Sequence, residues 1–271
     1  PWGQMSYWGA QVIVNLFGVV PFIGPDLALW IRGDYVVSDA TLNRFFALHV
    51  IAIPLVLLGL VVAHILALHD VGSNNPDGIE IKKTKGADGK PLDGIPFHPY
   101  YTVKDTVGAV VFLAIFCIVL FFMPELGGYF LEANNFIPAD PLKTPDHIAP
   151  LWYFTPFYSI LRANVYNFFW IDAKIWGVIF MGLSIVVFFL LPWLDRSPVK
   201  SIRYRGVLYK TALALFVVSF IILGYLGTKS PEIISLFWFK NVYWVQAFTV
   251  LYFAFFFLMP MLYLSGFIFP I

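Results

Sequence analysis

Long apolar stretches alternate with polar segments along this chain. Five of them are long enough to cross a bilayer, at roughly residues 41–68, 107–123, 175–194, 208–226 and 242–269. A hydrocarbon core of about 30 Å requires about 20 apolar residues in helical form. The pattern therefore predicts an all-α integral membrane helical bundle with about five transmembrane helices. Interfacial helices are expected in the first and third loops. One of them is the apolar segment at residues 8–22, which contains Asn15 and Pro21 and is too short to span.

Composition supports the bilayer as the solvent. The chain is 60% hydrophobic and 12% charged, with a mean hydropathy of +0.79. Soluble domains average about 45–50% apolar and about 25% charged residues. The net charge of +1 gives no reason to expect nucleic acid as a partner. The single cysteine, Cys117, can build neither a disulfide framework nor a thiolate metal site.

Charges in the loops predict an orientation. The loop between the third and fourth stretches is basic, with Arg196, Lys200, Arg203, Arg205 and Lys210 against Asp195. The loop between the first two stretches is also rich in lysine, although acids balance it. By the positive-inside rule both loops face the cytoplasm. The opening segment, residues 124–174 and residues 228–241 are then expected to face outward.

Two histidines lie inside the first apolar stretch. His49 and His64 are fifteen residues apart, about 22 Å along an α-helix and about 60° past four full turns. They therefore share roughly one face, one near each side of the membrane, and Pro54 between them can adjust the angle. Imidazole is a common axial ligand of heme iron. Spacing alone leaves interhelical hydrogen bonds or a proton relay as alternatives.

Several motifs, in order along the chain, resemble the cytochrome b family. Residues 3–10 read GQMSYWGA, residues 44–49 RFFALH, residues 68–76 LHDVGSNNP and residues 95–105 IPFHPYYTVKD. Residues 138–145 (PADPLKTP), 150–154 (PLWYF) and 160–162 (ILR) resemble the outer quinone-site loop of that family. The last two apolar stretches match only in hydropathy.

The resemblance implies roles for particular residues. His49 would be an axial ligand of a low-potential heme near the outside, and His64 of a high-potential heme near the inside. The outer quinol pocket would be lined by Met5, Gly9, Ile13, Ile148, Pro150, Trp152, Tyr153, Phe154 and Tyr158. The inner quinone pocket would use His69, Ser73, Lys104 and Asp105. Tyr153 outside, and His69 and Asp105 inside, are the candidate catalytic residues.

The sequence departs from the family pattern in three respects. It holds one transmembrane histidine per heme, so three preceding helices and the second axial ligand of each heme are expected outside this sequence. The two histidines are fifteen residues apart, where many mitochondrial-type members have fourteen. Leu151 stands where the family usually has a glutamate, so Tyr153, Asp146, His147 or a water chain would handle the quinol proton.

The implied protein is a di-heme subunit of a quinol:cytochrome c oxidoreductase of the bacterial type. It oxidises quinol at an outer site and passes electrons through two b hemes to quinone at an inner site. Residues 1–105 would end the heme- and quinone-binding N-terminal part, and residues 106–271 would form the C-terminal part. Expected partners are a Rieske iron–sulfur protein, a c-type cytochrome, a second copy in a dimer, and membrane lipid. The expected location is the bacterial inner membrane, with the outer site facing the periplasm.

Two other classes remain open from the residues alone. One is a non-redox membrane protein such as a transporter, with His and Asp side chains forming a proton path. The other is a different di-heme quinone enzyme, such as the membrane anchor of a dehydrogenase. The outer-loop motif, which serves quinol oxidation with an iron–sulfur partner, disfavours the second.

Overall fold

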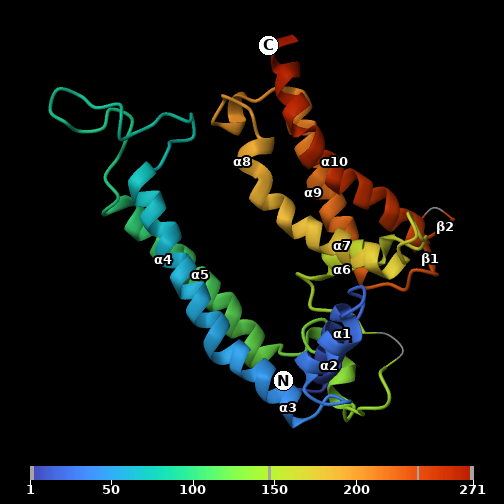
Figure 1. Ribbon diagram of the computed structural model, residues 1–271. Coiled ribbons are helices and arrows are strands. Elements are labelled where there is room, and N and C mark those ends of the chain that lie inside the picture. Colours follow the sequence, from blue (N-terminus) through green and yellow to red (C-terminus); the bar gives the residue numbers. More distant parts are fainter. Residues whose placement is uncertain (1–2, 146–147, 237, 269–271) are drawn as a thin grey trace. The chain divides into compact units, whose positions relative to one another are not determined.

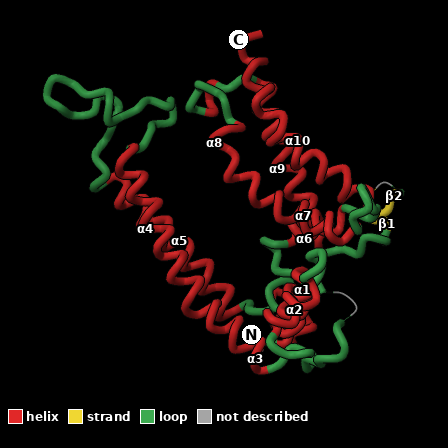
Figure 2. Tube along the Cα trace, in the orientation of Figure 1, coloured by secondary structure: helices red, strands yellow, loops and turns green. Residues whose placement is uncertain are grey.

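The computed structural model describes residues 3–145, 148–236 and 238–268, and they are mostly helical (Figures 1 and 2). The α-helices, in chain order, are α1 (Gln4–Phe17), α2 (Gly24–Arg32), α3 (Asp39–Ala47), α4 (Ile53–Val71), α5 (Tyr100–Phe122), α6 (Thr155–Ala163), α7 (Ala173–Val186), α8 (Leu191–Leu194), α9 (Val207–Gly227) and α10 (Asn241–Ile268). A π-helical turn at Leu48–Ala52 joins α3 to α4, and a 3-10 turn at Val187–Leu190 joins α7 to α8. The strands β1 (Ile234–Leu236) and β2 (Phe239–Lys240) form one short antiparallel pair.

Five spans in the described part of the chain are long and apolar enough to cross a membrane. They are Asp39–Val71, Tyr100–Phe122, Ala173–Leu194, Val207–Gly227 and Asn241–Leu262. The prediction of an all-α membrane bundle with about five spans is thereby confirmed, and helices are present in the opening segment and in the loop before α7. The largest difference is in the second span, which begins at Tyr100 rather than at residue 107. Lys104 and Asp105 lower the hydropathy of its first turns without interrupting the helix.

The chain divides into two compact units, and each is described by itself. The first comprises Pro1–Gln11 and Arg32–Pro145, and the second comprises Val12–Ile31 and Asp146–Ile271. In the first unit, the start of α1 is held by polar contacts to distant backbone. The Tyr7 hydroxyl donates to Val37 O at 2.6 Å, the Trp8 indole donates to Lys143 O at 3.3 Å, and Ala139 N donates to the Gln4 side chain at 2.7 Å.

The core of the second unit is formed by α6, α7, α9 and α10. Its buried side chains are Ile160, Ala163, Val187, Leu223, Leu226, Val245, Tyr252, Phe255, Phe256 and Met259. Phe216 of α9 stacks on Phe255 with ring centroids 4.8 Å apart, and the Tyr252 hydroxyl donates to Ser184 O at 2.7 Å. Burial of these aromatic rings holds the helices together, while the polar tip of Tyr252 is satisfied by a backbone carbonyl.

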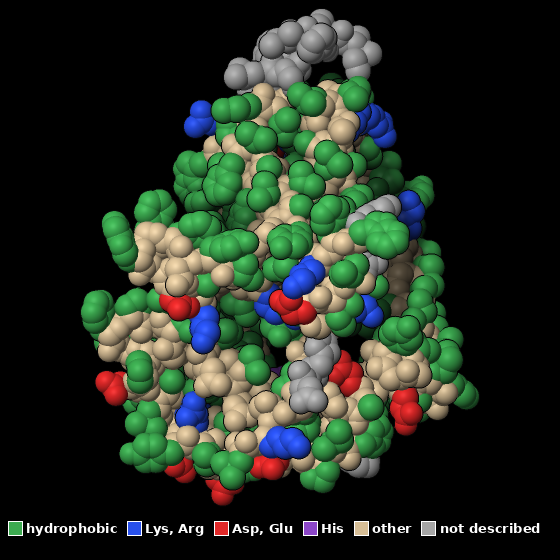
Figure 3. Space-filling model, turned by 90° about the vertical axis from the view of Figure 1, so that its right-hand side faces the viewer, with side chains coloured by type: hydrophobic (Ala, Val, Ile, Leu, Met, Phe, Trp, Pro, Cys, Tyr) green, Lys and Arg blue, Asp and Glu red, His purple; other side chains and the backbone are tan. Residues whose placement is uncertain are grey.

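The long helices of the first unit have no buried face of their own. Every residue of α4 and α5, all of which the structure describes, is exposed or half-buried. Apolar side chains also cover much of the face drawn in Figure 3, with charged side chains scattered among them. A helix that is apolar all round must be covered by lipid, by other helices or by a cofactor. The helix that carries His49 and His64 is therefore free to contact such a group.

Candidate functional site

A widened helical turn surrounds His49. The backbone N–H of Ile53 donates to Leu48 O, five residues back, where an α-helix would bond four residues back. Pro54 directly follows and has no N–H to donate, and its ring would clash with the carbonyl four residues before it. The turn at Leu48–Ala52 is thus a local response to Pro54. Such π-turns are rare and occur frequently at functional sites.

This turn corrects the angle expected between the two histidines. Because it takes up one additional residue, the fifteen residues from His49 to His64 turn the helix about as far as fourteen residues of plain α-helix. At about 100° per residue, His64 then lies about 40° short of four turns from His49 rather than about 60° beyond. Fourteen residues are also two heptads, the spacing that repeats on one face in a left-handed bundle. The two imidazoles still share a face.

Both imidazoles fit the role of an axial ligand. His49 and His64 are exposed, and no hydrogen bond or ion pair to either is found in the described residues. Within residues 3–145, 148–236 and 238–268, no three His, Cys, Asp or Glu side chains gather to hold a bare metal ion. A heme would need only a single side chain such as an imidazole from this helix, and not a cluster of ligands. A partnerless imidazole on an otherwise apolar helix suits that need.

The predicted inner-site residues lie where the first span ends and the second begins. His69 is in the last turn of α4, and Ser73 follows two residues after that helix ends. Lys104 and Asp105 occupy the first turns of α5, with the Lys104 ammonium 5.3 Å from the Tyr101 ring centroid. All four are exposed. In the described structure no hydrogen bond joins the His69 and Ser73 pair to the Lys104 and Asp105 pair.

Lys82, which the sequence did not single out, lies against the end of α4. Its ammonium donates to the backbone carbonyls of His69 and Asp70. A cation at a helix C-terminus also complements the helix dipole. Lys82 therefore fixes the backbone that carries His69 and leaves the imidazole ring itself free.

Three predicted outer-site residues form one stripe on α1. Met5, Gly9 and Ile13 are spaced by four residues, so they lie on one face. The face that contacts the loop through Gln4 and Trp8 is a different one. A β-carbon at Gly9 would have no heavy atom within 4 Å, apart from its own helix and chain neighbours. The stripe therefore leaves room for a planar group to approach the backbone.

The PLWYF motif forms a cluster of aromatic rings before α6. The Trp152 and Tyr153 rings meet edge to face with centroids 5.6 Å apart, and Tyr153 and Phe154 are 5.0 Å apart. Leu151 is 60% exposed, and Ile148 and Pro150 are half-buried. Asp146 and His147, the alternative proton acceptors, lie outside the described residues.

Helix α6, which carries Tyr158, is docked at close range on its neighbours. A β-carbon at Gly227 of α9 would clash with the carbonyl oxygen of Thr155, and one at Gly177 of α7 with that of Leu161. The Ser159 hydroxyl donates to Leu223 O at 2.5 Å. Two glycines and one hydroxyl thus let α6 approach α7 and α9 backbone to backbone, which fixes the height and rotation of the helix.

Arg162 anchors the same helix at its other end. Its guanidinium donates to Gly227 O at 3.1 Å and Leu226 O at 3.3 Å, and its Cζ lies 4.2 Å from the Tyr158 ring centroid. Burial lowers the pKa of Arg162, while the neighbouring Tyr158 opposes that shift. A guanidinium nevertheless stays charged at any physiological pH. It is stabilised by the carbonyl end of α9 and by the face of the tyrosine ring.

In the sequence, Arg162 ends the ILR motif without any indication of its partners. An arginine that ends an otherwise apolar helical face is a usable signal, because a partly buried cation needs partners. Its partners are 64 and 65 residues away in the chain, so the sequence could not name them. The π-turn could not be read from the sequence either, because Pro54 predicts a bend in the helix but does not show which backbone hydrogen bond changes.

A mostly helical membrane protein that carries two imidazoles on one span, both without a partner among the described residues, belongs to the class that can bind heme within the bilayer. Residues 1–129 match the family "Cytochrome b(N-terminal)/b6/petB", and residues 138–253 match "Cytochrome b(C-terminal)/b6/petD". The chain belongs to the cytochrome b family.

Relatives of known name support the same conclusion. The chain is 59% identical to cytochrome b of Allochromatium vinosum over 266 residues, which cover 96% of this chain and 61% of that protein. It is 50% identical to cytochrome b of Rickettsia prowazekii over 229 residues, covering 84% of this chain and 53% of that protein. A chain of a hyperthermophilic respiratory Complex III superposes with a TM-score of 0.81 at 37% identity, covering 99% of this chain and 65% of that one. The chain thus spans between about half and two thirds of the length of these relatives.

Proposed function

We propose that this chain is part of the di-heme cytochrome b of a quinol:cytochrome c oxidoreductase, in which it supplies one axial ligand to each heme. The observation that carries the proposal is the pair of imidazoles on one helix. His49 and His64 are exposed, partnerless among the described residues and about 21 Å apart along the helix axis. Membership in the cytochrome b family favours this redox role over a proton relay in a transporter.

His49 is assigned to the low-potential heme on the outer side, and His64 to the high-potential heme on the inner side. Each would hold its heme through one ring nitrogen, together with a ligand expected outside this sequence. When bound, the two hemes supply one-electron redox chemistry on both sides of the bilayer. The π-turn before Pro54 sets the rotation of His49 relative to His64, so the backbone itself positions the ligand.

At the outer site, we assign quinol oxidation to the α1 stripe and the aromatic cluster before α6. Gly9 leaves space on the stripe of Met5 and Ile13, and the Tyr153 hydroxyl offers a hydrogen bond to a quinol oxygen. Leu151 can neither accept nor donate a proton, so it contributes apolar packing. Ile148, Pro150, Trp152 and Phe154 supply further apolar walls.

Arg162 has a positioning role at that outer site. Its guanidinium packs against the face of the Tyr158 ring and also ties α6 to the end of α9. Both contacts restrain the segment that carries Tyr158. We therefore count Arg162 as a residue that acts through Tyr158 and not as one that contacts quinol.

At the inner site, His69 and Asp105 supply protons to a reduced quinone oxygen, with Ser73 and Lys104 as further polar contacts. Both proposed proton donors lie at ends of spans, His69 in the last turn of α4 and Asp105 in the first turns of α5, on the side that the positive-inside rule assigns to the cytoplasm. Carboxylic acid and imidazole side chains are suited to general acid catalysis near neutral pH. Net proton release outside and uptake inside would contribute to the proton gradient.

The family resemblance also supports particular partners and a location. We propose that a Rieske iron–sulfur protein accepts one electron at the outer site, that a c-type cytochrome follows it, and that the complex is a homodimer. The location proposed is the bacterial inner membrane, with the outer site facing the periplasm. The basic loop between α8 and α9, which holds an ion pair of Arg205 with Asp195 at 2.8 Å, would then lie in the cytoplasm.

The experiment that tests the two-site assignment uses the whole complex in membranes. Asp105→Asn and His69→Ala should slow reoxidation of the b-type absorbance by quinone, while reduction by quinol at the outer site stays near normal. Asp93→Asn, an exposed carboxylate in the solvated loop, is the matched control and should change neither phase. If Asp105→Asn instead slowed only the quinol-driven reduction, the inner assignment would be wrong.

A further inference from the structure

The helix that carries Tyr158 is short and depends on its neighbours for its shape. α6 has nine residues, which make about two and a half turns. Isolated helices shorter than about 12–15 residues are only marginally stable, so packing must hold this one in place. Tyr158 N also donates to Phe154 O at 3.0 Å, which joins α6 to the aromatic cluster of the PLWYF motif. A displacement of α6 would therefore be passed on to that cluster.

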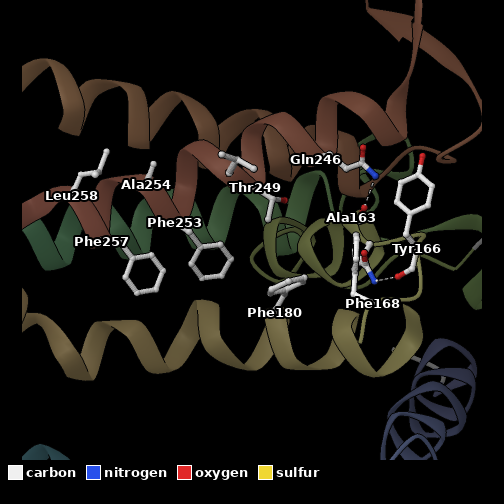
Figure 4. Close-up of a pocket in the computed structure, with 12 residues that line it drawn as sticks. Ala163, Tyr166, Phe168, Phe180, Gln246, Thr249, Phe253, Ala254, Phe257 and Leu258 are labelled. Carbon is white, nitrogen blue, oxygen red and sulfur yellow. Dashed lines mark hydrogen bonds between the residues drawn. The ribbon is translucent and has the colours of Figure 1, made fainter. Parts of the chain in front are cut away.

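The end of α6 is bonded to a side chain of α10. The Gln246 amide donates to Ala163 O at 2.9 Å, across 83 residues of sequence (Figure 4). Ala163 is the last residue of α6, and the carbonyls in the last turn of a helix have no donor within that helix. Because Ala163 is only 5% exposed, water is a poor substitute for the amide. Gln246 thus caps the end of a neighbouring helix.

The turn that Gln246 caps closes on Tyr158. In an α-helix each N–H donates to the carbonyl four residues back, so Arg162 N pairs with Tyr158 O in α6. The Arg162 guanidinium also lies 4.2 Å from the Tyr158 ring centroid. If the last turn opened, Tyr158 would lose this backbone bond and its ring would lose the support of Arg162. A bond made at Ala163 can therefore influence Tyr158, five residues earlier.

Gln246 holds α6 from a different side than the contacts to α9. The Ser159 hydroxyl and the Arg162 guanidinium donate to carbonyls of α9, whereas Gln246 reaches α6 from α10. Gln246 is half-buried, and its surroundings include the rings of Phe180 and Phe253 (Figure 4). An amide beside apolar rings is costly unless it is hydrogen-bonded. The bond to Ala163 O satisfies that requirement and fixes the end of α6 at the same time.

We propose that Gln246 is a positioning residue of the outer quinol site, which acts from α10 through the last turn of α6 on Tyr158. It holds the Tyr158 ring in place and does not contact quinol itself. This role rests on the outer-site assignment proposed above. Loss of the bond loosens one wall of the pocket, so the affinity for quinol falls more than the rate at which bound quinol reacts.

The test is steady-state turnover of the whole complex in membranes, measured against the concentration of a short-chain benzoquinol. Gln246→Met keeps the length of the side chain and removes the donor. It should raise KM for quinol about three- to tenfold, with less than about a twofold change in kcat. Gln246→Asn keeps the amide but is one methylene shorter, so it should behave like Gln246→Met. Gln246→Lys has a long stem and an ammonium that can donate to the same carbonyl, so it should restore KM to within about twofold.

Val250→Met is the matched control for these variants. Val250 lies one turn after Gln246 on the same face of α10 and borders the same apolar surface, but its side chain makes no hydrogen bond. The substitution should change neither KM nor kcat. The b-type heme spectrum of each variant reports whether the complex has assembled, and if Gln246→Met does not assemble, Gln246→Asn carries the same test.

A second background separates the role of Gln246 from the outer-site assignment on which it rests. Tyr158→Ala should raise KM by itself, and Gln246→Met added to it should change KM by less than about twofold, because Gln246 acts through Tyr158. An unchanged KM in Tyr158→Ala would show that the outer-site assignment is wrong. A raised KM in Tyr158→Ala, with normal KM in Gln246→Met and Gln246→Asn, would refute the role of Gln246 alone. Full multiplication of the two effects in the double variant, or a fall in kcat without a rise in KM, would refute it as well.

Discussion

The π-turn at His49 makes a specific prediction about deletions in the first span. Deleting Val50, which lies within the turn, should let the segment close into plain α-helix. His49 and His64 would then be fourteen residues apart and would keep nearly their present rotation and rise. We therefore expect this variant, in the full-length protein within its complex, to retain both hemes.

Deleting Leu58 gives the matched control, because that residue lies in regular α-helix after the turn. The π-turn stays, so His64 is rotated by about 100° relative to His49 and shifted by about 1.5 Å. At a radius of about 5–6 Å from the helix axis, that rotation moves the side chain by about 8 Å. A metal–nitrogen bond is only about 2 Å long. This deletion should therefore remove at least one heme.

The assay is the reduced-minus-oxidised spectrum of membranes, with heme content scaled to the amount of complex. Because Pro54 would stand in plain helix after deletion of Val50, the same deletion is also made with Pro54→Ala, which removes the kink. Loss of heme in both Val50-deleted proteins, together with full heme content in the Leu58-deleted protein, would refute the role given to the π-turn.

Two other predictions concern the outer site. Leu151→Ala should leave much of the quinol turnover intact, while Tyr153→Phe should slow it. Leu151→Glu adds a proton acceptor, so the turnover rate of that variant should rise as pH increases through the glutamate pKa. Quinol turnover measured against pH is the test, and loss of activity in Leu151→Ala with the hemes intact would contradict the role given to Leu151. Arg162→Ala should leave the Gly227 carbonyl of α9 without the guanidinium donor, at about 1–3 kcal/mol, whereas Leu226 O still accepts from Lys229 N. Amide exchange in α6 should then accelerate tenfold or more, with exposed Arg196→Ala as the control, and unchanged exchange would show that Arg162 does not hold the helix.

The spans were predictable from sequence because membrane insertion depends on summed hydropathy over about 20 residues. Four of the five spans were predicted to start within two residues of the first residue that the structure shows. The exception is α5, whose first turns hold Lys104 and Asp105 and so lack the apolar signal. Local hydrogen bonding starts that helix at Tyr100.

The candidate site was predictable only in its residue types. His49 and His64 stand out because imidazoles are rare in apolar spans, whereas their relative angle depends on one backbone hydrogen bond that sequence spacing does not reveal. The role of Arg162 could be recognised only from its neighbours, because its guanidinium donates to carbonyls at the end of α9, 64 and 65 residues away in the chain.

The assignment of His49 and His64 as heme ligands is the central claim, and heme content measures it directly. In the full-length protein within its complex, His49→Ala and His64→Ala should each remove one b-type heme, because each loses one neutral imidazole ligand. The two difference spectra should be distinct, since His49 and His64 would hold hemes at different depths of the membrane. Full content of both hemes in either variant would contradict the assignment.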